Sequence, residues 1–223
     1  MTRVVVVSGS PKMKKGHTER ILKPFVDGMK EAGADVDLFY VKQLDIRPCK
    51  GDFYCWNTNP GACLIDDDMQ SVYPVLKRAD ILVLATPVYI PLPGEMQNFL
   101  NRICPLIDPV LTKRNDRTRV RLRSDVRIKK IVLVSSSGWW EVGNFGTVLR
   151  IAKEIASDLS VEFVGAVLRP HAFMLAKGGK KADRVLEAAK ESGRQLVATG
   201  RMSKRSLDAV AKPLISEEAL RKM

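Results

Sequence analysis

Five stretches of the chain carry the apolar patterns of β-strands, and segments with apolar residues at helical spacing separate them. The runs at 4–7 and 80–85 are apolar, as expected for strands buried on both faces of a parallel sheet, whereas 35–41 alternates. The predicted strands are residues 4–7, 35–41, 80–85, 130–135 and 161–168, and the predicted helices begin near residues 17, 67, 95, 145 and 181. Strands that alternate with helices predict an α/β fold with a doubly wound parallel sheet and right-handed crossovers.

One domain is enough to hold these elements, because the chain has 223 residues, of which 45% are hydrophobic. We predict one domain over residues 1–201 and a tail over residues 202–223 with a short helix capped by Ser216. No apolar run approaches the roughly 20 residues of a membrane span. The sequence starts directly with a strand and lacks a signal-peptide pattern, so we expect a cytoplasmic protein with no membrane partner.

The net charge of +12 raises the question of nucleic-acid binding. Much of the excess lies in residues 113–130, where arginine and lysine far outnumber the acidic residues Asp116 and Asp125. This segment has no interleaved aromatic residues and no recognisable nucleic-acid-binding module. A solvated loop, or one that faces an anionic cosubstrate, is therefore favoured over a nucleic-acid interface.

The loop after the first predicted strand has the chemistry of a phosphate site. Small residues from Ser8 to Pro11 are followed by Lys12, two more lysines, and a helix that opens at 16–18. Backbone N–H groups and the positive end of a helix dipole attract an anion there, and hydroxyl groups donate to it. The spacing excludes a P-loop and a dinucleotide fingerprint. A flavodoxin-like fold offers such a loop to flavin mononucleotide (FMN) at its switch point; the alternative is an ordinary turn that binds nothing.

Two more predicted strands end in loops of similar character. The strand at 80–85 runs into residues 86–94, which contain three prolines and Tyr89, and the strand at 130–135 runs into 135–140, a serine-rich segment with two tryptophans. Ligands of doubly wound sheets bind beyond the carboxyl ends of the strands. One shared site that uses all three loops is the most economical interpretation.

With these loops assembled, the sequence resembles the NAD(P)H-dependent FMN reductase family of flavodoxin-like proteins. Within that family it is most similar to the branch called iron–sulfur flavoproteins. The matching segments are GSPKMKKGHT, CKGDFYCWNTNPGACLIDDDM, ATPVYIPLPGEMQNFLNR, VLVSSSGWWE and GAVLRPHAF. The resemblance implies a flavodoxin-like FMN-binding domain whose five-stranded parallel sheet has the order 2-1-3-4-5, with helices on both faces.

The resemblance also implies cofactor-binding residues. The FMN phosphate is expected on Ser10, Lys12, His17 and Thr18; the isoalloxazine ring on Pro87, Val88, Tyr89 and Ile90; and the ring's other edge on Ser136, Ser137, Gly138 and Trp139. We expect the N–H groups of Val88 and Tyr89 to meet the polar edge of the flavin. Tyr89 and Trp139 have an alternative role in plain packing, and His171 is expected to make a structural hydrogen bond. No catalytic side chain is assigned, because the flavin itself carries the hydride.

The cysteines depart from the branch's pattern. Cys49, Cys55 and Cys63 lie in the segment where the iron–sulfur branch has its cluster, but Asp52 stands where a cysteine is expected. A cluster needs about four ligands, usually thiolates. Asp52 or Cys104 are the possible replacements, although Cys104 follows a different predicted strand. The sequence therefore does not favour a metal site, and a degenerate loop that caps the flavin is the preferred interpretation.

These observations predict an FMN-dependent oxidoreductase that takes hydride from NAD(P)H and passes electrons to a flavin, a quinone or another small acceptor. The alternative is an iron–sulfur flavoprotein-type electron carrier that receives electrons from a ferredoxin. A regulator that binds nucleic acid through residues 113–130 is a third, less favoured class. The long connections at 42–66 and 104–128 lead us to expect a homodimer or homotetramer in which one molecule covers the flavin of another.

Overall fold

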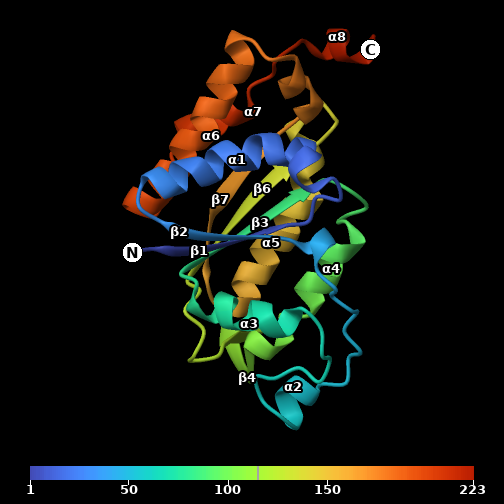
Figure 1. Ribbon diagram of the computed structural model, residues 1–223, viewed down its shortest axis with the longest axis vertical. Helices are drawn as coiled ribbons and strands as arrows, with labels where there is room; N and C mark the ends of the chain where they lie inside the picture. Colours follow the sequence, from blue (N-terminus) through green and yellow to red (C-terminus); the bar gives the residue numbers. More distant parts are fainter. Residues whose placement is uncertain (115) are drawn as a thin grey trace.

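The valines near the start of the chain form an inner strand of a parallel sheet. In the computed structural model, which describes residues 1–114 and 116–223, β1 (Arg3–Ser8) pairs with β2 (Asp35–Tyr40) on one side and with β3 (Ile81–Pro87) on the other. Two further strands, β6 (Lys130–Ser136) and β7 (Glu162–Arg169), extend the sheet beyond β3. The order β2-β1-β3-β6-β7 confirms the predicted order of the five core strands (Figure 1).

Helices cover both faces of this sheet, as predicted. One layer consists of α1 (His17–Glu31) and α6 (Lys180–Thr199), and the other of α3 (Met69–Arg78), α4 (Gly94–Asn101) and α5 (Gly146–Leu159) (Figure 1). Side chains of β1 pack against both helix layers, because successive side chains of a strand point to opposite faces. Val4 and Val6 pack in the core below α1 and α6, whereas Val5 and Val7 pack in the other core. This explains the continuous apolar run in the sequence.

Shorter elements connect these layers. The 3₁₀ helices are η1 (Met13–Lys15), η2 (Val41–Gln43), η3 (Cys104–Leu106), η4 (Val142–Phe145) and η5 (Ala172–Lys177). The connection that holds three cysteines contains one short helix, α2 (Tyr54–Asn57). Within the described residues, no helix is long and apolar enough to cross a membrane.

The connection expected at 104–128 is more regular than the sequence suggested. It folds into an antiparallel hairpin of β4 (Ile107–Arg114) and β5 (Arg117–Leu122), which forms a separate two-stranded sheet. The two strands were not predicted, because a segment with so many charged residues is usually a solvated loop. The charges are instead matched by acidic residues of the hairpin and of α5, including Glu154.

The C-terminal tail contains α7 (Lys204–Ala211) and α8 (Glu217–Arg221). The predicted cap of the last helix is confirmed, because the Ser216 hydroxyl accepts a hydrogen bond of 3.2 Å from the N–H of Ala219. The helix α7, which packs beside α6 and β7, was not expected from the sequence. The boundary at residue 201 stays a prediction.

The helices α1 and α6 approach each other at backbone distance. Gly28 faces the carbonyl group of Lys190, and Gly193 faces that of Phe25; a Cβ atom on either glycine would overlap the opposite backbone. Backbone atoms cannot move aside as flexible side chains do. The close packing of this layer therefore depends on the absence of two side chains.

We expect Gly193→Ala to lower the free energy of unfolding by about 1–3 kcal/mol, the usual cost of overpacking a core. Gly146→Ala is the matched control, since an added Cβ there meets nothing within 4 Å. Urea denaturation of both variants measures the difference. Equal stabilities would contradict this account of the helix contact.

Candidate functional site

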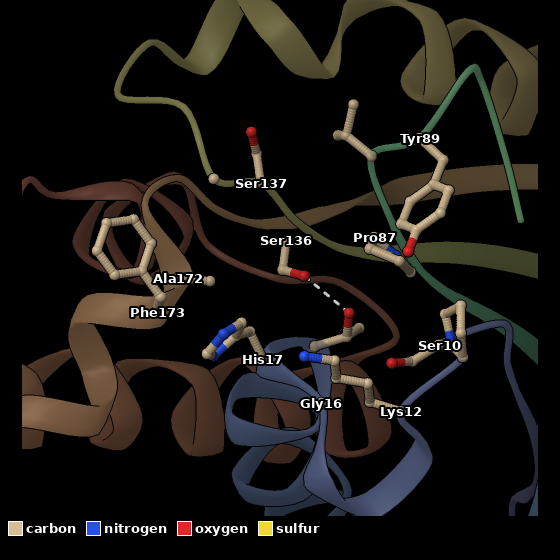
Figure 2. Close-up of a pocket in the computed structure, with 14 residues that line it drawn as sticks. Ser10, Lys12, Gly16, His17, Pro87, Tyr89, Ser136, Ser137, Ala172 and Phe173 are labelled. Carbon is tan, nitrogen blue, oxygen red and sulfur yellow. Dashed lines mark hydrogen bonds between the residues drawn. The ribbon is translucent and has the colours of Figure 1, made fainter.

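A cavity of about 250 Å³ lies beyond the carboxyl ends of β1, β3 and β6. Its walls come from the three loops that the sequence singled out and from the start of η5 (Figure 2). This is the edge where the strand order reverses, since β2 lies on one side of β1 and β3 on the other. The position is the ligand site of open α/β sheets.

One end of the cavity has the features of an anion cradle. Gly16 precedes α1 in an extended conformation, and no side chain caps the first turn of this helix. The first N–H groups of a helix then need another partner, and an anion satisfies them. Gly16 also lies against the Ser10 hydroxyl so closely that a Cβ would overlap it. The cradle therefore requires glycine at this position.

Hydroxyl groups tie this cradle to the neighbouring strand. Thr18 Oγ1 and Ser136 Oγ lie 2.7 Å apart and form a buried hydrogen bond, drawn in Figure 2. Ser10 is also buried, with 4% of its surface exposed. The bond joins the start of α1 to the end of β6, so two walls of the cavity are held in fixed positions.

Two basic side chains stand at the same end, Lys12 and His17, and both are exposed. Partial burial and the neighbouring charges of Arg20 and Lys12 hold the pKa of His17 below its ordinary value of 6.5. His17 is therefore a neutral donor at pH 7 in the free site. A bound dianion would oppose this effect and favour the charged imidazole.

The other end of the cavity is formed by Pro87, Val88 and Tyr89. The expectation that the N–H groups of Val88 and Tyr89 face a ligand is wrong. The Val88 N–H donates to the carbonyl oxygen of Ser136 at 2.8 Å, and the Tyr89 N–H donates to that of Pro91 at 3.1 Å. One bond joins the loop to the end of β6 and the other closes the loop, so this wall offers a ligand mainly apolar surface.

Most of the expected binding residues meet at this cavity. Ten of the twelve line it, namely Ser10, Lys12, His17, Thr18, Pro87, Val88, Tyr89, Ser136, Ser137 and Gly138. Ile90 and Trp139 are absent from the lining and strongly exposed, at 101% and 64%. Their contact with a ligand stays a prediction.

Four lining residues were not among the twelve expected ones: Pro11 and Gly16, which belong to the phosphate-type loop, and Ala172 and Phe173. The last two follow β7, a strand whose loop carried no phosphate or aromatic pattern of its own. Phe173 lies edge-on to His17, with ring centroids 6.4 Å apart. The segment GAVLRPHAF was part of the family resemblance, and that was the only available signal.

A buried arginine at the end of β7 is hydrogen-bonded to a loop that lines the cavity. Arg169 has 0% exposure, and its guanidinium donates to three carbonyl oxygens at 2.7, 2.7 and 2.9 Å. These belong to Pro170, Val210 and Lys212. Its own carbonyl oxygen accepts the N–H of Ser137 at 3.0 Å. Arg169 thereby connects the C-terminal tail to a loop that lines the cavity.

His171 completes this network, which confirms its expected structural hydrogen bond. Its Nε2 accepts from the N–H of Leu214 at 3.1 Å and lies 2.8 Å from an Nη of Arg169. Two donors on one nitrogen require an unprotonated Nε2, so we assign the neutral tautomer with its proton on Nδ1. Burial and the charge of Arg169 lower the pKa of His171 to about 4.

The four cysteines lie together elsewhere. They line a second cavity of about 400 Å³, and all four are free thiols. Burial raises the pKa of Cys55 to about 11 and raises that of Cys104, and the neighbouring thiols act in the same direction. Among the described residues, no three His, Cys, Asp or Glu side chains are placed to hold a metal ion. Cys104 belongs to this cavity although it follows a different strand.

The basic segment at 113–130 is largely neutralised within the molecule. Arg119 pairs with Glu154 at 3.0 Å and with Asp158 at 3.2 Å, and Arg121 pairs with Asp108 at 3.0 Å. Arg114 donates to carbonyl oxygens at the end of α5. Arg114 and Arg119 fasten the hairpin to α5, and Arg121 pairs within the hairpin, which weakens the case for an anionic partner there.

The sequence model of a known family, described as NADPH-dependent FMN reductase, matches residues 2–150. The chain belongs to this family. The matched range includes the phosphate-type loop, the proline-rich loop after β3 and the serine-rich loop after β6. The resemblance expected from the sequence is thereby confirmed, and with it FMN as the cofactor.

Individual proteins show the same relationship. An iron–sulfur flavoprotein of Methanosarcina thermophila is 32% identical over 87 residues, which are 39% of this chain and 44% of that protein. The chain spans about half the length of the curated relatives it matches. An NAD(P)H:quinone oxidoreductase from Methanothermobacter marburgensis superimposes with a TM-score of 0.60 at 16% identity, over 87% of this chain and 96% of that one.

An FMN-dependent NADH-azoreductase from Bacillus anthracis superimposes with a TM-score of 0.57 at 12% identity, over 89% of this chain and 98% of that one. At such low sequence identities these superpositions show only that the fold is shared. They confirm the flavodoxin-like architecture.

The cavity fits FMN on its own features. An uncapped helix start, a buried serine and two basic side chains gather at one end, as a phosphate requires. The other end offers proline and tyrosine surface against which a flat ring packs. Lys12, Gly16 and Thr18 would hold the phosphate, and Pro87 and Tyr89 would contact the ring.

The neutral His171 predicts a dependence of stability on pH. Its folded pKa of about 4 lies below the ordinary 6.5, so the unfolded chain binds more protons between these values. The contribution of neutral His171 to the free energy of unfolding should therefore be complete above pH 6.5. It should fall as the pH drops toward 4, by at most about 1.4 kcal/mol per pH unit. In His171→Gln, whose amide oxygen replaces Nε2 as acceptor and does not titrate, that slope should be smaller. Denaturation at pH 5 and pH 7 checks this, and identical slopes would refute it.

Proposed function

We propose that the protein is an FMN-dependent oxidoreductase that takes hydride from NAD(P)H and passes electrons to a flavin, a quinone or another small acceptor. The observation that carries this proposal is the cavity at the switch point, with an anion cradle at one end and an apolar wall at the other. Membership of the NADPH-dependent FMN reductase family supports it.

FMN, when bound, supplies the hydride-accepting ring and its two-electron chemistry. The residues of this chain bind and orient it. The cradle fixes the phosphate, and the hydrogen bonds of Val88 to the end of β6 and of Tyr89 to Pro91 keep the ring wall rigid. Tyr89 is 55% exposed, so the mouth of the cavity is open to a second flat molecule. A nicotinamide and then an acceptor would use this opening in turn.

The proposal is tested by an anaerobic absorption spectrum of the purified protein before and after addition of NADPH or NADH. Flavin bands that bleach with either nucleotide support the reductase, and the faster donor identifies the cosubstrate. A protein that cannot be loaded with FMN would overturn it.

The phosphate cradle predicts a selective effect of one lysine. In Lys12→Gln, the Kd for FMN should rise about 10- to 150-fold, since a charge-assisted contact is worth about 1.5–3 kcal/mol. Binding of riboflavin, which lacks the phosphate, should not change. Lys30→Gln at the far end of α1 is the control for loss of charge and should bind both flavins normally. Fluorescence titration of the wild type and both variants measures the Kd for each flavin. An equal loss of affinity for FMN and riboflavin in Lys12→Gln would show that Lys12 does not contact the phosphate.

We further propose a homodimer or homotetramer. Tyr89, Ile90, Trp139 and Val142 expose apolar surface on the loops at and near the mouth of the cavity. A second copy would shield this surface and complete the roof over the ring. Light scattering coupled to size-exclusion chromatography should give a mass of two or four chains of 24.9 kDa; a monomer would contradict the proposal.

A second candidate function is an electron carrier that receives electrons from a ferredoxin. The cavity lined by four cysteines is the observation that favours it. Such a carrier would hold iron and sulfide and react poorly with both nicotinamides. Iron analysis together with the NADPH titration distinguishes the two candidates.

A further inference from the structure

Two arginines are fully buried among the described residues, and they differ in their counter-charge. Arg102 is 1% exposed, and its guanidinium pairs with the carboxylate of Asp67 at 2.5 Å. Arg169 is 0% exposed and forms no ion pair with an acidic side chain in the described part of the chain. Its hydrogen-bond partners are three carbonyl oxygens and the Nε2 of His171, all of them neutral. The positive charge of Arg169 therefore lacks a matching negative charge there.

The fastening of the C-terminal tail does not explain why this residue is charged. Burial lowers the pKa of Arg169 to about 10, and no acidic group opposes this effect, so the guanidinium stays charged at pH 7. An unpaired buried charge is among the costliest groups in a protein interior. A glutamine amide could donate to the carbonyl oxygens of Val210 and Lys212, which Arg169 now holds, without that cost.

Strand pairing places Arg169 next to the flavin-type cavity. It is in register with Ser136 on β6, and neighbouring strands lie about 4.8 Å apart. Both side chains point to the same face of the sheet, because Val134 and Val167, two residues earlier, both pack in the core below α1 and α6. Ser136 lines the cavity and is hydrogen-bonded to Thr18 at the start of α1. Arg169 therefore lies one strand away from the anion cradle.

The chain that follows Arg169 leads to the same end of the cavity. Ala172 and Phe173 line it, and the ring of Phe173 lies edge-on to His17 (Figure 2). The apolar wall, in contrast, follows β3, which β6 separates from β7. His171 is neutral at pH 7, because its pKa is about 4, so it does not alter the local charge. The charge of Arg169 thus faces the cradle rather than the apolar wall.

We propose that Arg169 is the buried counter-charge of a phosphate monoester bound in the cradle, and that it attracts this dianion through the protein interior without touching it. A buried charge acts more strongly than an exposed one, because water and salt screen it less. The inference rests on the proposed FMN site. It adds a residue, distant from the ligand, that discriminates a phosphorylated flavin from one without phosphate.

The test is fluorescence titration with three flavins that differ in charge at pH 8. Riboflavin is neutral, its 5′-sulfate carries one negative charge, and FMN carries about two. In Arg169→Gln, the Kd for FMN should rise about 10- to 30-fold more than the Kd for riboflavin, with the sulfate between them. A general loosening of the fold would raise all three Kd values by the same factor.

Trp140→Phe is the matched control for such loosening. The indole N–H of Trp140 donates to the carbonyl oxygen of Ile215 at 3.2 Å, so this variant weakens the same attachment of the tail and leaves the charge unchanged. Its three Kd values should change by a common factor. Circular dichroism and urea denaturation of the same samples show whether each variant is folded.

A second measurement keeps the wild-type Arg169, in case Arg169→Gln does not fold. In 1 M NaCl the Debye length is only about 3 Å, so exposed lysines are screened. Lys12→Gln should still bind FMN at least about fivefold more tightly than riboflavin in this salt, because the buried charge remains. A preference for FMN that disappears in 1 M NaCl would overturn the proposal, as would an equal change of all three Kd values in Arg169→Gln.

Inorganic phosphate separates this inference from the proposed function. Phosphate should raise the urea midpoint of the flavin-free wild type above its value in chloride of equal ionic strength, and the increase should be absent in Arg169→Gln. That result in a protein that binds no flavin would support the counter-charge and overturn the proposed function. A wild type that binds FMN while phosphate stabilises it and Arg169→Gln equally would overturn the counter-charge alone.

Discussion

The structure depends on one constraint, the burial of β1 on both faces and both edges. Val4 to Val7 contact helix layers on either side, and parallel partners occupy both edges of the strand. Parallel strands require crossovers, so every strand of the sheet delivers its carboxyl end to the same edge. The reversal of strand order beside β1 leaves a gap between the loops at that edge. The flavin-type cavity is a consequence of this topology.

Two buried arginines hold the loops that this topology brings together. Arg102 is matched by the carboxylate of Asp67 and fixes the cysteine connection. Arg169 has carbonyl oxygens and the neutral His171 as partners and fixes the loop at Ser137 against the C-terminal tail. A buried charge is costly unless it is hydrogen-bonded. Each arginine therefore enforces a definite arrangement of the segments around it, one beside each cavity.

Charge elsewhere serves the fold in a similar way. The hairpin of β4 and β5 carries a dense group of the basic residues that raised the question of nucleic-acid binding. Arg114 and Arg119 use their hydrogen bonds on α5. Part of the positive charge therefore serves to fasten the small β4–β5 sheet to α5.

The sequence by itself determined the five strands of the parallel sheet, most of the helices that cover it and the phosphate-type loop, because apolar periodicity and turn chemistry act between near neighbours. Ten of the cavity's lining residues followed from the family resemblance. Tertiary structure alone decided the rest. It brought Phe173 to His17 and Cys104 to Cys55, and it turned the Val88 N–H toward Ser136. Such contacts join segments far apart in the chain. They depend on how helices and strands pack, and no local pattern of residues records that.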